Sequence, residues 1–304
     1  MLGYACINET LKKDKIFTSR TMRKKTFLEK GLDYVSDLSL MNCQDLLKIL
    51  QWNEDNNMRF FRMSSNFIPW FSEFDFSSLK DSSKIEEVLK SVGCFAEQYG
   101  HRLTMHPDHF CKLATPKQNV LDSTIKELEF HGFFMDMIGL SRSHYNKINI
   151  HIGAAYNDKI STAKQFCDNF HLLSESVRSR LTVENDDKES LYTTQELFDL
   201  VYKNINIPIV FDYHHHNLNP GEQTTEDAFF LALQTWDGLG FNPVFHYSES
   251  RSVEQNDDKI KPQAHSDMIY SYIDTFGFNV DIMIEAKKKE LSLLHYRELY
   301  NKGE

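Results

Sequence analysis

The sequence predicts a single-domain (β/α)8 barrel, or TIM barrel, over residues 1–304. Short β-rich runs alternate with amphipathic helical stretches from end to end of the chain, which is the rhythm of this fold. Several of the β-rich runs are almost continuously apolar, as is expected of parallel strands that are buried on both faces. The main rival is a doubly wound open sheet, and it is disfavoured because no glycine-rich dinucleotide fingerprint follows any run.

Eight strand-then-helix units account for the whole chain. The helix expected over residues 45–57, for example, places four aliphatic side chains at helical spacing, namely Leu46, Leu47, Ile49 and Leu50. The expected strands cover residues 2–6, 59–63, 102–106, 147–153, 181–186, 208–213, 243–248 and 280–286. The expected helices cover residues 45–57, 84–99, 120–137, 162–173, 194–203, 225–236, 267–276 and 287–300.

The charge of the chain restricts the kind of partner that it can have. Its formal net charge is -10, whereas proteins that coat nucleic acid without specificity are usually basic overall. This charge does not exclude an enzyme that acts at particular sites on nucleic acid. Bound divalent metals and a local basic patch can dominate the electric field at such a site.

Nothing in the sequence indicates export or a membrane partner. No stretch approaches the roughly 20 apolar residues of a membrane-spanning helix, and residues 1–8 lack the basic leader and cleavage site of a signal peptide. The cysteines are scattered and form no CxxC pair: Cys6, Cys43, Cys94, Cys111 and Cys167. Such cysteines are typical of reduced thiols, so we expect an intracellular protein.

Six consecutive expected strands end in a carboxylate or an imidazole. These residues are His106 in TMHP, His151 in NIHIG, Glu184 in TVEND, Asp212 and His215 in VFDYHHH, His246 in VFHYSES and Glu285 in MIEAK. His265, in AHSD, follows in the loop after the seventh strand. Because the carboxyl ends of the strands of a parallel barrel meet at one rim, we expect all these side chains to share one pocket.

Imidazoles and carboxylates are the ligands of zinc, manganese and iron. Eight such residues exceed the needs of one metal, so the pattern predicts two or three ions that share a bridging carboxylate. Without metal, clustered carboxylates in a buried pocket would repel each other and resist ionisation. The alternative is a barrel in which a few histidines hold one structural zinc.

A single histidine in a strand is more often a core or surface residue than a ligand. His131, His144, His171 and His295 fit that interpretation, because they lie in expected helices or loops away from the strand ends. His214 alternates with its neighbours along the expected strand, so it either faces away from the pocket or supports a ligand. The set at the strand ends differs because it recurs on consecutive strands.

The motifs together resemble those of the UV damage endonucleases, which are relatives of the endonuclease IV branch of apurinic-site nucleases. They are LGYACIN, RMSSNFIPW, MHPDHF, HIGAAY, VEND, DYHHHNLNPG and MIEAKKKE, and they run in this order over nearly the whole chain. The resemblance implies a TIM-barrel enzyme with two or three divalent ions, most often Mn²⁺, with Zn²⁺ or Mg²⁺ as alternatives. It implies incision of DNA on the 5′ side of cyclobutane dimers and 6-4 products, and action at abasic sites.

The resemblance also implies roles for individual residues. The metal ligands map onto His106, His151, Glu184, Asp212, His215, His246, His265 and Glu285, with Glu184 as the bridging carboxylate. Tyr4 and Asn8 match residues that line the lesion pocket. His109 and Phe110 stand where the family has residues that probe the lesion and fill the gap in the duplex, although many relatives have Gln-Tyr there.

Two departures from the family pattern bear on the number of ions. Some relatives have histidine at the position of Asn66, and some have lysine at the position of Val244. Any metal contact that those groups make is missing from this chain. The eight remaining ligands still suffice for two ions and support a third.

For catalysis, we expect the water that attacks the phosphate to lie near Glu184 and Glu285. Lys287, just past Glu285, is a candidate phosphate contact, and the alternative is a solvated lysine at the start of a helix. A basic stretch after the first strand is the candidate surface for the DNA backbone: Lys12, Lys13, Lys15, Arg20, Arg23, Lys24 and Lys25. The expected partner is damaged double-stranded DNA, bound by a monomer.

Two other functional classes remain open at this point. A sugar isomerase or epimerase on the same barrel also has a divalent metal site rich in carboxylates, but such sites use fewer histidines. A binder of damaged DNA that does not cleave it would have no need of the complete ligand set.

Overall fold

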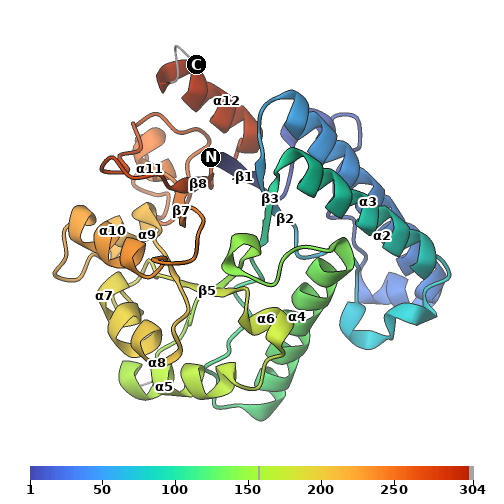
Figure 1. Ribbon diagram of the computed structural model, residues 1–304, viewed down its shortest axis with the longest axis horizontal. Coiled ribbons are helices and arrows are strands. Elements are labelled where there is room, and N and C mark those ends of the chain that lie inside the picture. The colour runs from blue at the N-terminus through green and yellow to red at the C-terminus, as the bar shows by residue number, and fades with distance from the viewer. Residues whose placement is uncertain (157, 301–304) are drawn as a thin grey trace.

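The computed structural model describes residues 1–156 and 158–300, and these form an eight-stranded parallel barrel surrounded by helices (Figure 1). The strands are β1 Leu2–Ala5, β2 Phe60–Met63, β3 Arg102–Met105, β4 Ile148–Ile150, β5 Leu181–Glu184, β6 Ile209–Val210, β7 Val244–Tyr247 and β8 Asp281–Ile284. Each strand lies inside the run of residues expected to form it. The prediction of a TIM barrel is therefore confirmed.

The barrel has a seam between β6 and β7. The strands pair in the order β6-β5-β4-β3-β2-β1-β8-β7, so these two stand at the ends of the sheet. They meet at one isolated parallel bridge between Asp212 and His246. There the backbone N–H of His246 donates to the carbonyl oxygen of Phe211 at 2.9 Å. The seam is thus closed at two residues that the sequence predicts as metal ligands.

Helical segments connect successive strands. The α-helices are α1 Glu9–Lys12, α2 Lys24–Asp55, α3 Ser82–Tyr99, α4 Gln118–Ile138, α5 Lys159–Phe170, α6 Glu175–Arg178, α7 Thr194–Leu197, α8 Lys203–Ile205, α9 Tyr213–Leu218, α10 Thr225–Gln234, α11 Arg251–Glu254 and α12 Lys289–Tyr300. Shorter turns are η1 Phe71–Glu73, η2 Phe76–Ser78 and η3 His144–Asn146, and the π-helical η4 Phe198–Tyr202 joins α7 to α8. Among the described residues, no helix is both long and apolar enough to cross a membrane.

The helix α2 begins earlier than the hydrophobic pattern predicts. It starts at Lys24 and bends at Gly31, whose φ of 62° lies in the left-handed region that favours glycine. The segment before the bend is held by a tertiary contact, because the ring of Phe27 stacks on Trp70 with centroids 5.4 Å apart. Because Trp70 is far from Phe27 in the sequence, a local hydrophobic pattern cannot predict this contact. The helix α2 therefore starts earlier than expected and includes Lys24 and Lys25.

The helix predicted over residues 267–276 does not form, and this prediction is wrong. Two carboxylates take up the backbone N–H groups that a helix would use. Glu254 accepts from the backbone N–H of Asp267 at 2.7 Å, and Glu249 accepts from that of Ser271 at 2.8 Å. The hydroxyl of Tyr296 accepts a hydrogen bond from the backbone N–H of Ile273 at 3.1 Å. The donors are therefore satisfied without a helical ladder.

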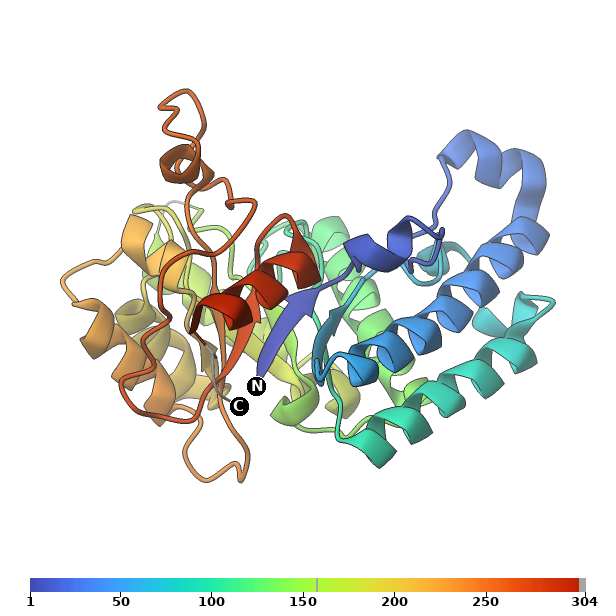
Figure 2. The ribbon, with the colours of Figure 1, turned by 90° about the horizontal axis from the view of Figure 1, so that it is seen from above.

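Two parts of the chain project beyond the barrel at the end where the strands have their carboxyl termini. Figure 2 shows the first part of α2 on one side and the segment that contains α11 on the other. Both belong to connections that follow strands, as the loops of a TIM barrel that carry function do. The predicted ligands therefore lie on the face that these projections flank.

At the opposite end of the barrel, the side chain of Arg102 is completely buried. Its Nη1 lies 2.8 Å from Oδ2 of Asp281, and its Nε donates to the carbonyl oxygen of Tyr145 at 2.8 Å. The two charged residues begin β3 and β8, so the pair holds the amino-terminal ends of these strands to each other. A buried pair of this kind is costly to break, because the partner that remains keeps its charge without compensation.

We expect Arg102→Met to lower the free energy of unfolding by about 3 kcal/mol, because the buried Asp281 loses its buried cation and keeps only the partly exposed amino group of Met1. Urea denaturation measures this change. The control is Arg59→Met, which removes an ion pair of 2.6 Å with Glu54 where the arginine side chain is 47% exposed. The control should change stability by at most about 1 kcal/mol, and equal losses in the two variants would contradict the argument.

Candidate metal centre

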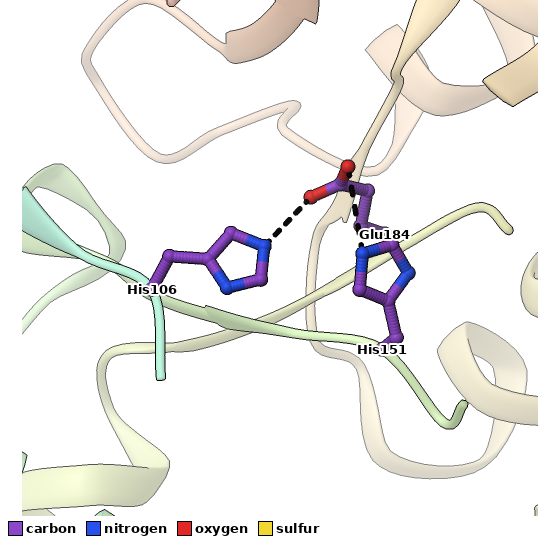
Figure 3. A group of neighbouring side chains, drawn as sticks. All are labelled: His106, His151 and Glu184. Atoms are coloured by element: carbon purple, nitrogen blue, oxygen red, sulfur yellow. Dashed lines mark ion pairs between the residues drawn. The ribbon is translucent and has the colours of Figure 1, made fainter. Parts of the chain in front are cut away.

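Glu184, the last residue of β5, lies at the centre of the cluster and is 1% exposed. The Nε2 of His106 lies 3.3 Å from its Oε2, and the Nε2 of His151 lies 3.7 Å from its Oε1. Figure 3 shows both rings directed at the carboxylate. The Nδ1 atoms of His215 and His246 lie 3.2 Å and 3.1 Å from the same carboxylate. One carboxylate is therefore surrounded by four imidazoles.

Glu285, directly after β8, forms a second centre beside the first. Its Oε1 lies 3.1 Å from Nδ1 of His246, so this imidazole stands between the two glutamates. Its Oε2 lies 3.8 Å from Nδ1 of His265. The guanidinium of Arg62 in β2 makes an ion pair with Oε1. The two glutamates are thus linked through a shared histidine.

Asp212 places His215 by capping a helix. It is the N-cap residue of α9, and its Oδ1 accepts from the backbone N–H of His215 at 2.8 Å. The run of three histidines is therefore helical, and its members face different surroundings. The ring of His214 lies 5.7 Å from that of His265, and the ring of His216 lies 5.3 Å from that of Phe211.

Backbone carbonyl oxygens fix the orientation of three of the imidazoles. Nδ1 of His106 lies 3.0 Å from the carbonyl oxygen of Pro107, and Nδ1 of His215 lies 3.0 Å from that of Asn185. Nδ1 of His265 lies 2.7 Å from the carbonyl oxygen of Glu285. A carbonyl oxygen only accepts, so each Nδ1 carries a proton, which leaves Nε2 as the nitrogen that can bind a metal once it is unprotonated.

The cluster fits divalent metals. The residues form three overlapping groups, and within each group the ligand atoms lie within 4.8 Å of one another. Glu184 belongs to the first and second groups, and Asp212 to the second and third. The groups are His106, His151 and Glu184; Glu184, Asp212 and His215; and Asp212, His246 and Glu285. Among the described residues, three buried polar atoms of these groups make no hydrogen bond of suitable geometry, namely His151 Nδ1, Asp212 Oδ2 and His246 Nδ1, although carboxylate oxygens lie within 3.3 Å of the two nitrogens. Such atoms are the ones that a bound cation or its water would satisfy.

Seven of the eight predicted ligands are members of these groups. The eighth, His265, stands beside Glu285 and outside the three groups found among the described residues. His265 therefore lies at the edge of the cluster, next to Glu285.

The carboxylates of the cluster differ in their electrostatic environment. Burial alone would raise the pKa of Glu184, but the charges of His246 and His151 outweigh it and hold this pKa well below its usual range. Burial is likewise outweighed at Glu285, chiefly by Arg62, and its pKa is also held low. Burial does raise the pKa of Asp212. The two glutamates are therefore ionised at neutral pH.

The imidazoles divide into two kinds. Burial lowers the pKa of His106 to about 4 and also lowers that of His246. Burial acts in the same direction on His151 and His215, but nearby carboxylates raise the pKa of His151 and hold that of His215 well above its usual value. Two imidazoles are thus ready as neutral ligands, and two hold protons that serve as counter-charges for the carboxylates.

Three polar residues of the barrel interior support the cluster, in addition to the residues that the sequence predicts. Asn149 donates from Nδ2 to the Glu184 carboxylate, and Nζ of Lys147 lies 3.1 Å from Nε2 of His246. Burial lowers the pKa of this lysine to about 7. The signal for both was the alternation of Lys147, Asn149 and His151 along one strand, which places them on one face. Arg62 is the third.

Two predicted DNA-contacting residues on β1 and the loop after it are buried. Tyr4 and Asn8 are completely inaccessible, and Nδ2 of Asn8 donates to the Tyr4 hydroxyl at 3.0 Å. That hydroxyl donates to Oδ1 of Asn53 at 2.6 Å. These two side chains therefore bond to the protein itself beside the cluster.

The predicted contacts on the loops lie at the surface. Phe110 is 71% exposed, and its ring lies 4.0 Å from that of His109. Arg23 and Lys287 are exposed as well. Arg20 differs, because its Nη2 lies 2.6 Å from Oδ2 of Asp45 and this pair fixes the loop before α2.

Fold and site together define a class of protein. It is a TIM barrel whose strand ends present a cluster of carboxylates and imidazoles that fits several divalent ions. The chain belongs to the UV-endonuclease UvdE family, whose profile matches residues 1–302. The resemblance seen in the sequence motifs is thereby confirmed.

Named relatives and one crystal structure agree with this family. The chain is 35% identical to the UV-damage endonuclease of Schizosaccharomyces pombe over 98% of its own length and 50% of that protein. It is 31% identical to the putative UV-damage endonuclease of Acanthamoeba polyphaga mimivirus, over 96% and 89% of the two chains. The crystal structure of SacUVDE has a TM-score of 0.84 at 29% identity and covers 99% of this chain and 98% of that one. The chain thus spans about half of the Schizosaccharomyces pombe relative.

More distant structures share only the fold. Endonuclease IV from Thermus thermophilus has a TM-score of 0.57 at 15% identity, covering 86% of this chain and 96% of that one. The D-psicose 3-epimerase from Clostridium cellulolyticum has a TM-score of 0.52 at 13% identity, covering 79% and 78%. At such identities the likeness concerns the barrel and leaves the chemistry open.

We expect Glu184→Gln to bind Mn²⁺ at least about tenfold more weakly, because it removes one charged oxygen shared by two ligand groups. Elemental analysis after dialysis, together with a chelator competition assay, measures the effect. The matched control is Glu97→Gln, since Glu97 is exposed on α3 away from the cluster. Metal content equal to wild type in the Glu184 variant would exclude a bridging carboxylate.

Metal binding should weaken as the pH falls. His151 and His215 have raised pKa values in the metal-free protein, so an incoming ion must displace their protons, and more of these protons are present at low pH. His106, with a pKa of about 4, stays neutral above about pH 5 and adds no dependence there. The affinity should fall by up to about tenfold per pH unit for each displaced proton. Titration with Mn²⁺ between about pH 8 and pH 6 tests this, and a constant affinity would contradict it.

Proposed function

We propose that this protein is a metal-dependent endonuclease of DNA repair, which nicks the backbone on the 5′ side of ultraviolet photoproducts. Its substrates are cyclobutane dimers and 6-4 products in double-stranded DNA, and abasic sites. The observation that carries the proposal is the cluster around Glu184, where seven potential ligands form three overlapping groups. Membership of the UV-endonuclease UvdE family supports it.

The proposed cofactor is a set of two or three divalent ions, with Mn²⁺ preferred and Zn²⁺ or Mg²⁺ as alternatives. A mixed set of imidazoles and carboxylates suits manganese, whereas thiolates, which would favour zinc, contribute to none of the three groups. When bound, such ions supply a nucleophile from water at neutral pH and stabilise negative charge on the phosphate. One chain contributes all eight ligands, so a monomer suffices.

The protein residues have separate roles in this proposal. Glu184 and Glu285 stay ionised, so they can accept a proton from the attacking water and can serve as anionic ligands. Arg62 keeps Glu285 charged, and Asn149 holds the Glu184 carboxylate in place. Lys287, exposed beyond the strand end, contacts the DNA backbone at the rim.

The surface around the cluster offers contacts to a damaged duplex. The exposed cations of the basic stretch reach toward backbone phosphates, and Arg20 fixes that stretch through Asp45. Phe110, 71% exposed, inserts where the lesion leaves a gap, and His109 beside it probes the damaged bases. Tyr4 and Asn8 have no accessible surface and bond to each other, so they support this surface from within and do not touch the lesion.

The rival function is that of a sugar epimerase, which uses the same fold. An epimerase has no use for an exposed aromatic side chain and a basic segment in the loops that follow its strands. The D-psicose 3-epimerase is only 13% identical to this chain, and the similarity concerns the fold alone. Conversion of a ketose without incision of DNA would favour the rival.

The activity is tested with supercoiled plasmid that has been irradiated with ultraviolet light. We expect nicking that EDTA abolishes and Mn²⁺ restores, and no nicking of unirradiated plasmid. Glu184→Gln should nick at least about 10³-fold more slowly, because hydrolysis at neutral pH depends on the cluster. Glu97→Gln is the control. An inert wild-type protein that contains its metals would refute the proposal.

The side of incision is tested separately on a duplex with one defined thymine dimer. Labelling each end of the damaged strand in turn locates the cut, and we expect a 3′-hydroxyl directly 5′ to the dimer. A parallel duplex with one abasic site tests the second substrate. Cuts on the 3′ side alone would contradict the proposed polarity.

A further inference from the structure

Three consecutive lysines follow Glu285, and the third differs from the others. Lys287 and Lys288 are exposed, whereas Lys289 is half-buried. Lys289 begins α12 with a φ of 51°, in the left-handed region that a residue with a β-carbon rarely adopts. Residues held in such conformations gather at functional sites, where the surrounding structure imposes them.

The surroundings of Lys289 do impose its conformation. On one side, the backbone N–H of Lys288 donates to the carbonyl oxygen of Asp267 at 3.0 Å. On the other side, the completely buried carboxylate of Glu290 accepts from the backbone N–H of Glu9 at 2.8 Å. The start of α12 is therefore tied to two other segments, and Lys289 is fixed between them.

The segment that carries Lys289 runs beside the cluster. The backbone N–H of Lys287 donates to the carbonyl oxygen of Ser266, the neighbour of His265, at 2.9 Å, and Lys289 follows Glu285 by four positions. Burial lowers the pKa of Lys289. The Glu285 carboxylate is already paired with Arg62. Among the described residues, no carboxylate lies within 4.0 Å of the Lys289 ammonium. This cation is therefore positioned at the rim without an anion of its own.

We infer that Lys289 binds a phosphate of the damaged strand directly beside Glu285. The inference rests on the proposed function and assigns a residue to it. A half-buried ammonium on a fixed backbone, with no carboxylate partner among the described residues, suits a phosphate oxygen, which a lysine meets as a compact point charge. A phosphate bound by Lys289 lies next to the carboxylate of Glu285, the last ligand along the chain. Lys289 therefore determines which phosphate of the DNA strand lies over the cluster.

The exposed neighbour provides a matched comparison. Lys289→Met removes the charge and keeps most of the aliphatic stem, and Lys288→Met does the same one residue away. Affinity is measured for a duplex with one thymine dimer, in Ca²⁺ and over a series of salt concentrations. We expect Lys289→Met to bind about tenfold more weakly and its salt slope to fall by about 0.9. Lys288→Met should match wild type, and Lys289→Arg should recover most of the affinity.

The contacted phosphate is located with neutral methylphosphonates. Each phosphate near the dimer is replaced in turn in otherwise identical duplexes. We expect one duplex on which wild type and Lys289→Met bind equally, because the partner of the lysine has lost its charge. If the loss caused by Lys289→Met is the same on every duplex, the lysine contacts no single phosphate and the inference is overturned.

A second variant separates binding from folding. Lys289→Gly removes the side chain and suits the left-handed backbone, so its urea midpoint should be at or above that of wild type. We expect it to bind the damaged duplex as weakly as Lys289→Met. Wild-type affinity in this variant would overturn the inference.

Failure of the inference can be told from failure of the proposed function. Wild-type protein is assayed for incision of the same duplex in Mn²⁺ alongside each variant. If wild type incises and Lys289→Met incises and binds equally well, only the assignment of Lys289 fails. If wild type does not incise at all, the proposed function fails.

Discussion

The burial of the Glu184 carboxylate is the constraint on which the rest of the site depends. A buried carboxylate is stable only when positive charge or hydrogen-bond donors surround it. Here four imidazoles and Asn149 provide them. These groups come from β3, β4, β7 and the start of α9, so the carboxylate can be satisfied only if those elements converge. The same convergence creates the ligand groups, and the requirements of folding and of metal binding therefore coincide.

The seam of the barrel extends this dependence. β6 and β7 meet at one bridge, between Asp212 and His246, and both belong to the group that also contains Glu285. A cation in that group would join β6, β7 and β8 where the backbone ladder is weakest. Asp212 has a second duty as the N-cap of α9. Its conformation is therefore fixed by the helix even when its Oδ2 has no hydrogen-bond partner among the described residues.

The sequence allowed the barrel and its rim to be predicted for physical reasons. Parallel strands are buried on both faces, so their apolar runs stand out, and their carboxyl ends must share one rim. Lys147 and Asn149 alternate with the predicted ligand His151 and so share its inward face, but their contacts to His246 and Glu184 come from other strands and are not visible in the pattern of one strand. The helix predicted over residues 267–276 failed because Glu249 and Glu254 capture its N–H groups from a distance in sequence. The role of Arg20 could not be predicted for the same reason, because it pairs with Asp45, which belongs to another element.

If the proposed function holds, an acidic protein must confine its attraction for DNA to one face. With a net charge of -10, the protein as a whole repels a duplex at long range. The basic stretch and Lys289 belong to segments that follow strands at the rim, and bound divalent ions would add positive charge to the cluster between them. Attraction limited to this face weakens binding to intact DNA, which offers only its regular backbone. On the proposed function, a lesion that already unstacks the duplex would cost less to open and would present its phosphates to the cluster, so selectivity would follow from weak general attraction combined with one strong site.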